Sequence, residues 1–112
     1  MGRREDLVKA CAQDLRQKCG MAPEEELLDR VITACGPAAF SESGVVVDPA
    51  SDGEHAHIRS HFLVRKLGLK DGPALSDAID AAFEAYPHQG ERLLRPVLYY
   101  LLVKYFGLEA KL

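Results

Sequence analysis

The sequence predicts an all-α protein, a compact orthogonal bundle of about five helices around a central C-terminal helix. Apolar residues recur at helical spacing in five segments. Glycine or proline stands at most ends of these segments, where these residues favour the end or the start of a helix. One run of β-branched residues, at positions 45–47, is compatible with a strand but is too short to imply a sheet. We therefore expect helix in well over half of the chain.

The first predicted helix spans residues 3–19, and Gly20 follows it as a C-terminal cap. The second predicted helix begins near Pro23 and ends at Gly36. Three carboxylates in its first turn complement the positive end of the helix dipole: Glu24, Glu25 and Glu26. The short connection predicts that the two helices form an antiparallel hairpin.

Residues 37–51 are the least regular stretch, and we expect an ordered loop that crosses the surface and is anchored by Phe40. The third predicted helix then starts at Ser51. Ser51 and Glu54 match the Ser-x-x-Glu capping box that marks a helix N-terminus. This helix ends at Gly68.

The fourth predicted helix opens at Pro73 and ends before Pro87, and its alanines should allow close helix approach. The fifth covers roughly residues 91–106, with Pro96 in its first turns. It is apolar on nearly every side, which is typical of the buried centre of a bundle. We expect three of its leucines to lie in that centre: Leu98, Leu101 and Leu102.

The length of 112 residues fits one domain, which we assign to residues 1–112. The net charge is −3, with −5 in residues 1–54 and +2 in residues 55–112. Nucleic-acid-binding modules usually carry a strong basic excess, so nucleic acid is an unlikely partner and stays a minor alternative based on the basic second half.

The longest apolar run, residues 96–103, is shorter than the ~20 residues of a membrane helix. With no signal-peptide pattern at the start, we expect a cytoplasmic protein that has no membrane contact.

The three cysteines are odd in number and form no CxxC pair, which does not suggest a disulfide framework. Cys11, Cys19 and Cys35 each fall on an apolar helix side, so we expect free thiols that pack in the core and react slowly. Two alternatives are a redox pair between helices and a Cys–His nucleophile pair.

Glu54, His57 and His61 lie on one face of the third predicted helix. Two imidazoles and a carboxylate could bind zinc or another transition metal, which gives a second hypothesis for function. The order differs from HExxH, and the sequence places no fourth ligand. A solvated helix face is the simpler interpretation, so we expect no bound cofactor.

Positive side chains surround the end of the third predicted helix: Arg59, Arg65, Lys66 and Lys70. They could contact an acidic partner or the acidic first half of a second copy.

In the fifth helix, the leucines define one buried side, which should leave Tyr100 beside Lys104 on a polar stripe. A partly exposed tyrosine suits a protein interface, because its ring is apolar and its hydroxyl can still form a hydrogen bond. We therefore predict an interaction surface made of Arg59, Arg65, Lys66, Tyr100 and Lys104.

Two segments resemble signatures of a family of short uncharacterised bacterial proteins, an all-helical domain of unknown function. They are residues 62–69 (FLVRKLGL) and 95–107 (RPVLYYLLVKYFG), and Gly36-Pro37 and Ala78-Ile79 fit the same pattern. Pro96 and the histidines of the third helix depart from it. The departure at the histidines weakens the metal hypothesis, since a site shared by the family would not rest on them. The resemblance implies a compact helical bacterial protein and carries over no activity.

From these observations we expect a non-enzymatic interaction module that binds a protein partner or associates with itself. The alternative from another class is a metal-binding or metal-dependent protein that uses the Glu/His/His face.

Overall fold

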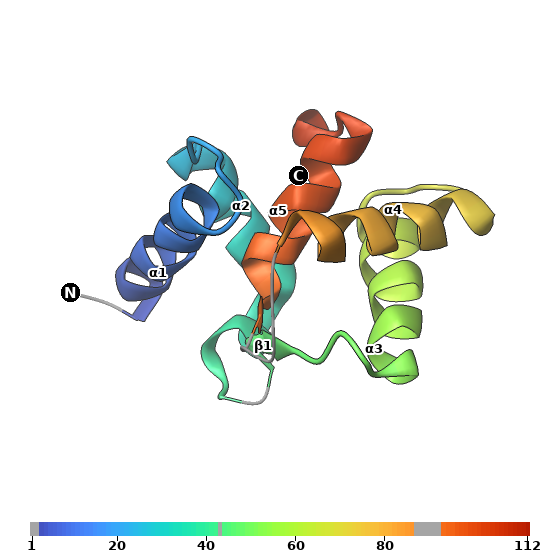
Figure 1. The fold of residues 1–112 in the computed structure, drawn as a ribbon, viewed down its shortest axis with the longest axis horizontal. Coiled ribbons are helices and arrows are strands. Elements are labelled where there is room, and N and C mark those ends of the chain that lie inside the picture. Colours follow the sequence, from blue (N-terminus) through green and yellow to red (C-terminus); the bar gives the residue numbers. More distant parts are fainter. Residues whose placement is uncertain (1–2, 43, 87–92) are drawn as a thin grey trace.

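A computed structural model of the chain describes residues 3–42, 44–86 and 93–112. Helices α1 (Arg3–Gln17) and α2 (Glu25–Cys35) lie side by side at one end of the molecule (Figure 1). A short 3-10 segment, η1 (Gly36–Phe40), continues from α2. The hairpin predicted from the short connection is confirmed, although α2 starts two residues later than Pro23.

Helix α3 (Asp52–His57) runs without interruption into η2 (Ile58–Lys66), whose turns are wider π-helical ones. At its end, the Leu67 N–H donates to the carbonyl oxygen of Phe62, five residues back, at 2.9 Å. Helix α4 (Pro73–Ala85) follows and crosses α3 and η2 steeply, as an orthogonal bundle requires (Figure 1).

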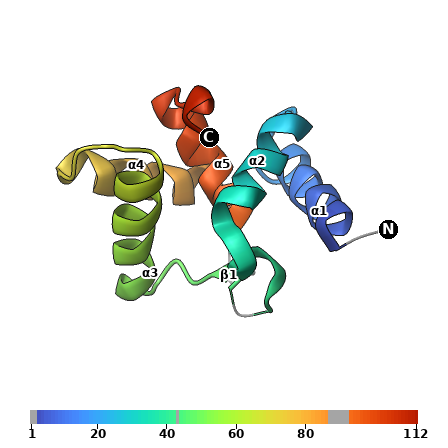
Figure 2. The same cartoon turned by 180° about the vertical axis from the view of Figure 1, so that it is seen from behind.

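Helix α5 (Arg95–Phe106) lies between the α1–α2 pair and the α3–α4 pair, which Figure 2 shows from behind. It packs against α1, α2 and α4. All of its first nine residues, Arg95 through Val103, are buried. Pro96 occupies the first turn, where a backbone N–H has no partner within the helix. The all-α fold with a central C-terminal helix is therefore confirmed.

Two glycines show how the sequence sets helix ends. Gly20 and Gly68 have φ of 66° and 72°, in the left-handed region that side chains disfavour. The next residue in each case donates its N–H to a carbonyl six residues back, Met21 to Leu15 at 2.9 Å and Leu69 to Leu63 at 3.0 Å. These bonds reach one residue further back than the bond of a Schellman motif, because the last turn before each glycine is a wide one, closed by Cys19 to Asp14 and by Leu67 to Phe62. The predicted ends near both glycines are confirmed.

A short pair of antiparallel strands differs from the prediction. Strand β1 (Val46–Val47) pairs with β2 (Leu93–Leu94), with Val46 opposite Leu94 and Val47 opposite Leu93. The expectation of a loop without strand pairing was therefore wrong here, and so was the expectation that residues 93 and 94 are helical. Residues 91 and 92 of the predicted fifth helix lie outside the described residues. A two-residue pairing between positions 46 to 48 residues apart leaves no periodic trace in the sequence.

No helix in the described part of the chain combines the length and apolar character that crossing a bilayer requires. A further 3-10 turn, η3 (Glu109–Lys111), follows α5.

Candidate functional site

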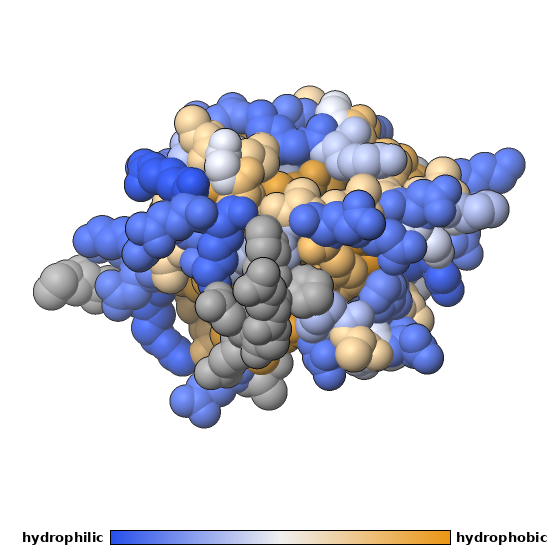
Figure 3. Space-filling model, viewed as in Figure 1, coloured by the Kyte–Doolittle hydropathy of each residue, from blue (hydrophilic) through white to orange (hydrophobic). Residues whose placement is uncertain are grey.

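Few large apolar side chains of the described residues are exposed at the surface. Hydrophilic side chains form most of the outline seen in Figure 3, with apolar side chains showing between them. Among the described residues, Tyr105 is the one large apolar side chain that is clearly exposed, at 58%. A concave site is therefore the better place to look for function.

A cleft of about 410 Å³ lies between α2 with η1 on one side and α3 with η2 on the other. Its walls include apolar side chains from both sides: Ala34, Ala38 and Phe62. Polar side chains stand along η2 and the end of α3: His57, His61 and Lys66. Helix α5 contributes Arg95 and Tyr99. The cleft is therefore formed by parts of the chain that are distant in sequence.

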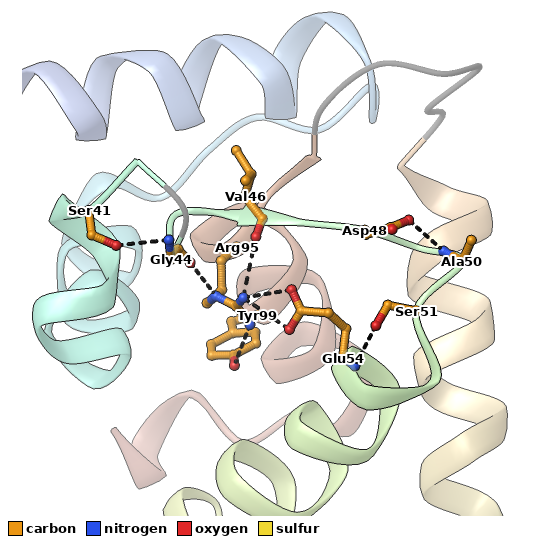
Figure 4. Close-up of polar contacts among 9 residues, drawn as sticks. All are labelled: Ser41, Gly44, Val46, Asp48, Ala50, Ser51, Glu54, Arg95 and Tyr99. Atoms are coloured by element: carbon orange, nitrogen blue, oxygen red, sulfur yellow. Dashed lines mark hydrogen bonds and ion pairs between the residues drawn. The ribbon is translucent and has the colours of Figure 1, made fainter.

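Arg95 is the central polar residue of this cleft, and it is only 7% exposed (Figure 4). Its Nε donates to the carbonyl oxygen of Gly44 at 2.6 Å, and one terminal nitrogen donates to that of Val46 at 3.3 Å. The same nitrogen forms an ion pair with the Glu54 carboxylate at 2.8 Å. The Arg95 backbone N–H donates to the Val45 carbonyl at 2.6 Å. One residue thus joins the start of α5 to residues 44–46, which lead into β1, and to α3.

The ion pair explains why the capping box of α3 is only half formed. The Ser51 hydroxyl accepts from the Glu54 backbone N–H at 3.2 Å, as predicted. The Glu54 carboxylate turns away from the helix start and binds Arg95 through both oxygens, at 2.8 and 3.0 Å. Burial alone would lower the pKa of Arg95, but the hydrogen bonds that Arg95 donates to Glu54 and Tyr99 outweigh it and raise the pKa, so Arg95 keeps its charge.

Tyr99 lies one turn after Arg95 and completes the polar contacts. Its hydroxyl accepts from Arg95 at 3.4 Å, and its ring stacks on Phe62 with the centroids 3.9 Å apart. Burial raises the pKa of Tyr99, partly offset by the Arg95 charge. Among the described side chains, no buried nitrogen or oxygen lacks a hydrogen-bond partner. The polar groups deep in the cleft are therefore paired within the protein.

The two histidines at the cleft stack on each other. The rings of His57 and His61 are 4.7 Å apart at their centroids, with an interplanar angle of 16°. Burial lowers the pKa of His57, and the neighbouring His61 and Arg95 lower it further, so His57 is neutral at pH 7. His55 on α3 lies apart, with its ring 5.0 Å from that of Phe83.

The structure gives the metal hypothesis little support. Glu54, His57 and His61 do line one cleft, but the Glu54 carboxylate is already bound to Arg95. Within the described residues, no three His, Cys, Asp or Glu side chains converge well enough to hold a metal ion.

The cysteines are free thiols in the described structure. Cys11 is buried, whereas Cys19 and Cys35 are partly buried, so the expected core positions hold fully only for Cys11. Burial raises the pKa of Cys11 and Cys35 to about 12 and that of Cys19 to about 11. Cys35 lines the same cleft as His57, which is the Cys–His arrangement considered from sequence. A thiol with such a pKa carries almost no thiolate at neutral pH, which disfavours a nucleophilic role.

Comparison with known protein families shows which family the chain belongs to. The family described as "Protein of unknown function (DUF2853)" matches residues 10–110. The chain belongs to the DUF2853 family. No curated protein matches the sequence at a significant level.

The family match confirms the resemblance seen in the sequence, while a bacterial origin stays a prediction. Both segments that carried the resemblance lie within the matched range. The C-terminal segment 95–107 supplies Arg95 and Tyr99, and the segment 62–69 supplies Phe62 and Lys66. In this DUF2853 member, the two signature segments therefore meet at the cleft.

The predicted exposure of Tyr100 was wrong. Tyr100 is fully buried, and its hydroxyl accepts from the Glu24 backbone N–H at 3.0 Å. Lys104 is half-exposed and forms ion pairs with Glu24 and, at 3.4 Å, with Glu109. The polar stripe assumed on α5 is thus a contact between α5, the start of α2 and η3.

The basic residues of η2 separate into two groups. Arg59 forms an ion pair with Asp71 at 3.5 Å. Arg65 and Lys66 are exposed and make no ion pair with another described side chain. Of the five residues predicted for the interaction surface, the structure brings only Lys66 to the cleft.

Sequence reasoning missed Arg95 and Tyr99. The available signal was a charged residue directly before Pro96 at the start of an otherwise apolar helix. A charge there needs a partner once the helix is buried. The partners, Glu54 and the loop carbonyls, are about 40 or more positions away, so their identity was not readable from the pattern.

Proposed function

We propose that the protein is a non-enzymatic interaction module and that the cleft between α2–η1 and α3–η2 is its recognition site. One observation carries the proposal. The cleft combines apolar walls with accessible polar side chains at its edge, while its deep polar groups are paired internally. Such a preformed surface loses little conformational entropy when a partner binds.

The chemistry of the cleft supports binding over catalysis. The pKa of the Cys35 thiol is raised to about 12, and the Glu54 carboxylate is held by Arg95. Neither group is poised as a nucleophile or a general base near neutral pH.

The partner proposed is another protein or a second copy of the chain. Three cysteines without a disulfide fit a reducing compartment such as the cytoplasm. Sedimentation velocity on the purified protein separates the two partners, since self-association raises the sedimentation coefficient with concentration.

A steric block at the cleft tests the proposal. His61 and its neighbour Ser60 are both exposed on η2, but only His61 lines the cleft. We expect His61→Trp to abolish capture of proteins that the tagged wild-type chain retains from its native cells, or to abolish self-association. Ser60→Trp should leave both unchanged. Equal binding by the wild type and both variants would show that the cleft is not the recognition site.

A further inference from the structure

The charges of the cleft are unbalanced. Two basic side chains, Lys66 and Arg95, line it together with two imidazoles, whereas Glu54 is the one carboxylate among its lining residues. That carboxylate is bound on both oxygens by Arg95. Lys66 is exposed and has no ion-pair partner among the described side chains. A group that enters the cleft therefore meets unmatched positive charge.

Arg95, which lines the cleft, also retains a donor. Its guanidinium has five N–H groups. Its side-chain contacts use Nε once and one terminal nitrogen for Val46 and both oxygens of Glu54. The other terminal nitrogen makes one contact, to Tyr99, at the long distance of 3.4 Å. One N–H of that last nitrogen has no acceptor among the described residues. A carboxylate that reached the bottom of the cleft could accept from it.

We propose that the cleft binds an acidic segment of a protein partner, with a carboxylate placed between Lys66 and Arg95 and apolar neighbours against Ala34 and Phe62. This inference rests on the proposed function and adds the chemistry of the partner. The cleft volume of about 410 Å³ accommodates a few side chains and not a folded domain. A protein segment is favoured over a free inorganic anion because an anion would leave the apolar walls uncovered.

His57, which lines the cleft, makes this binding depend on pH. His57 and His61 face groups from every surrounding element: Glu54 on α3, Lys66 on η2, Cys35 on α2, and Arg95 and Tyr99 on α5. Burial and the surrounding positive charge disfavour protonation of His57 in the empty cleft. A bound carboxylate offsets that charge and stabilises the imidazolium form, so affinity must rise as the pH falls through the histidine range.

The test uses a synthetic peptide, Gly-Glu-Glu-Leu-Gly with both ends blocked, titrated into the full chain and followed by NMR. We expect chemical-shift changes at Lys66, His57 and His61, and none with the peptide Gly-Gln-Gln-Leu-Gly. Lys66→Met should weaken binding about two- to fivefold, the effect of losing one exposed ion pair. Lys70→Met is the matched control, since Lys70 is exposed and does not line the cleft.

Two further comparisons complete the test. Between pH 7.5 and about 5.5, where glutamate stays ionised, wild-type affinity should rise, and His57→Asn with His61→Asn should remove the rise. His55→Asn should retain it. Equal binding of both peptides overturns the acidic-partner inference, and inorganic phosphate binding as tightly as the peptide also overturns it. If the acidic peptide fails while His61→Trp still abolishes protein capture, the inference falls and the proposed function stands.

Discussion

Arg95 is the residue on which the candidate site depends most. Its guanidinium donates hydrogen bonds to the carbonyl oxygens of Gly44 and Val46. Without Arg95, these two carbonyl groups would have to bind water instead. A buried charge is tolerated only when it is paired and hydrogen-bonded, and Glu54 supplies that pair. The same contacts position α3 relative to α5 and so determine the shape of the cleft.

Removing Arg95 should destabilise the protein strongly. We expect Arg95→Met to lower the free energy of unfolding by about 3 kcal/mol, at the lower end for a broken buried pair because water can reach Glu54. The Glu54 side chain is 21% exposed. Urea denaturation measures the change. Arg4→Met, which breaks the exposed pair with Asp29, is the control and should cost about 1 kcal/mol or less. Equal losses in both variants would contradict the role given to Arg95.

The cysteines should react slowly while the chain is folded. Their raised pKa values of about 11 to 12 leave little thiolate at pH 8, and burial restricts access further. A colorimetric thiol reagent should therefore label the native protein slowly and all three thiols rapidly in denaturant. Because the pKa of Cys11 and of Cys35 is raised on folding, each neutral thiol contributes to the free energy of unfolding. This contribution is complete below pH 9 and is lost as the pH rises toward about 12. Rapid labelling of Cys35 in the native state would reopen a nucleophilic role.

Helix α2 starts where a side chain from α5 reaches it. The Tyr100 hydroxyl accepts from the Glu24 N–H, which precedes the first turn of α2 and has no acceptor within the helix. This contact replaces a side-chain cap, since no side chain of its own caps α2.

Loss of that hydroxyl should weaken the start of α2. We expect Tyr100→Phe to cost about 0.5–1.5 kcal/mol, the net contribution of one hydrogen bond. Tyr100→Ala should cost about 3–5 kcal/mol, because it also leaves a cavity. Tyr105→Phe changes a hydroxyl on a residue that is 58% exposed and should have no effect on thermal unfolding. If Tyr100→Ala unfolds no more easily than Tyr105→Phe, the burial of Tyr100 is wrong.

Helix α5 should be the least tolerant element. Leu98 and Leu102 are fully buried, and Leu101 is 7% exposed. Truncating Leu102 to Ala should cost about 2–5 kcal/mol from lost burial and the cavity left behind. This is a large part of the total stability of a small domain, about 5–15 kcal/mol. Ala110 is exposed and lies after the helix. If Leu102→Ala lowered the free energy of unfolding less than Ala110→Gly does, the central place of α5 would be contradicted.

Helices were predictable because their signals are local. Apolar periodicity and the glycines at positions 20, 36, 68 and 107 placed the helix ends within a few residues. The prediction failed on α5 for the same reason. A helix that is apolar all round has no polar face, so its periodicity could not show that Tyr100 faces α2. The β1–β2 pair and the contacts of Arg95 depend on distant partners, which local patterns do not encode.

At the scale of the whole molecule, the two helix pairs on either side of α5 leave one cleft where the two family signature segments meet. The predicted interaction surface stays a prediction, and three of its five residues, Arg59, Tyr100 and Lys104, have partners within the chain. Lys66 is the one residue of that predicted surface that lines the cleft. There it joins His57 and His61, which the sequence assigned to a metal site, and Arg95 and Tyr99, which the sequence did not single out. The function class predicted from sequence therefore stays a proposal, with its site moved from the helix surface to the cleft.

Site-specific photo-crosslinking tests the recognition cleft most directly. A photoreactive amino acid at Ala38, which lines the cleft, is compared with one at Ala74, an exposed position on α4 away from it. In native cells, we predict a discrete crosslinked protein, or a crosslinked dimer of the chain, from position 38 and none from position 74. The acidic peptide added in excess should reduce the crosslink. Identical crosslinks from both positions, or none from position 38 in a folded chain, would contradict the assignment of the cleft as the recognition site.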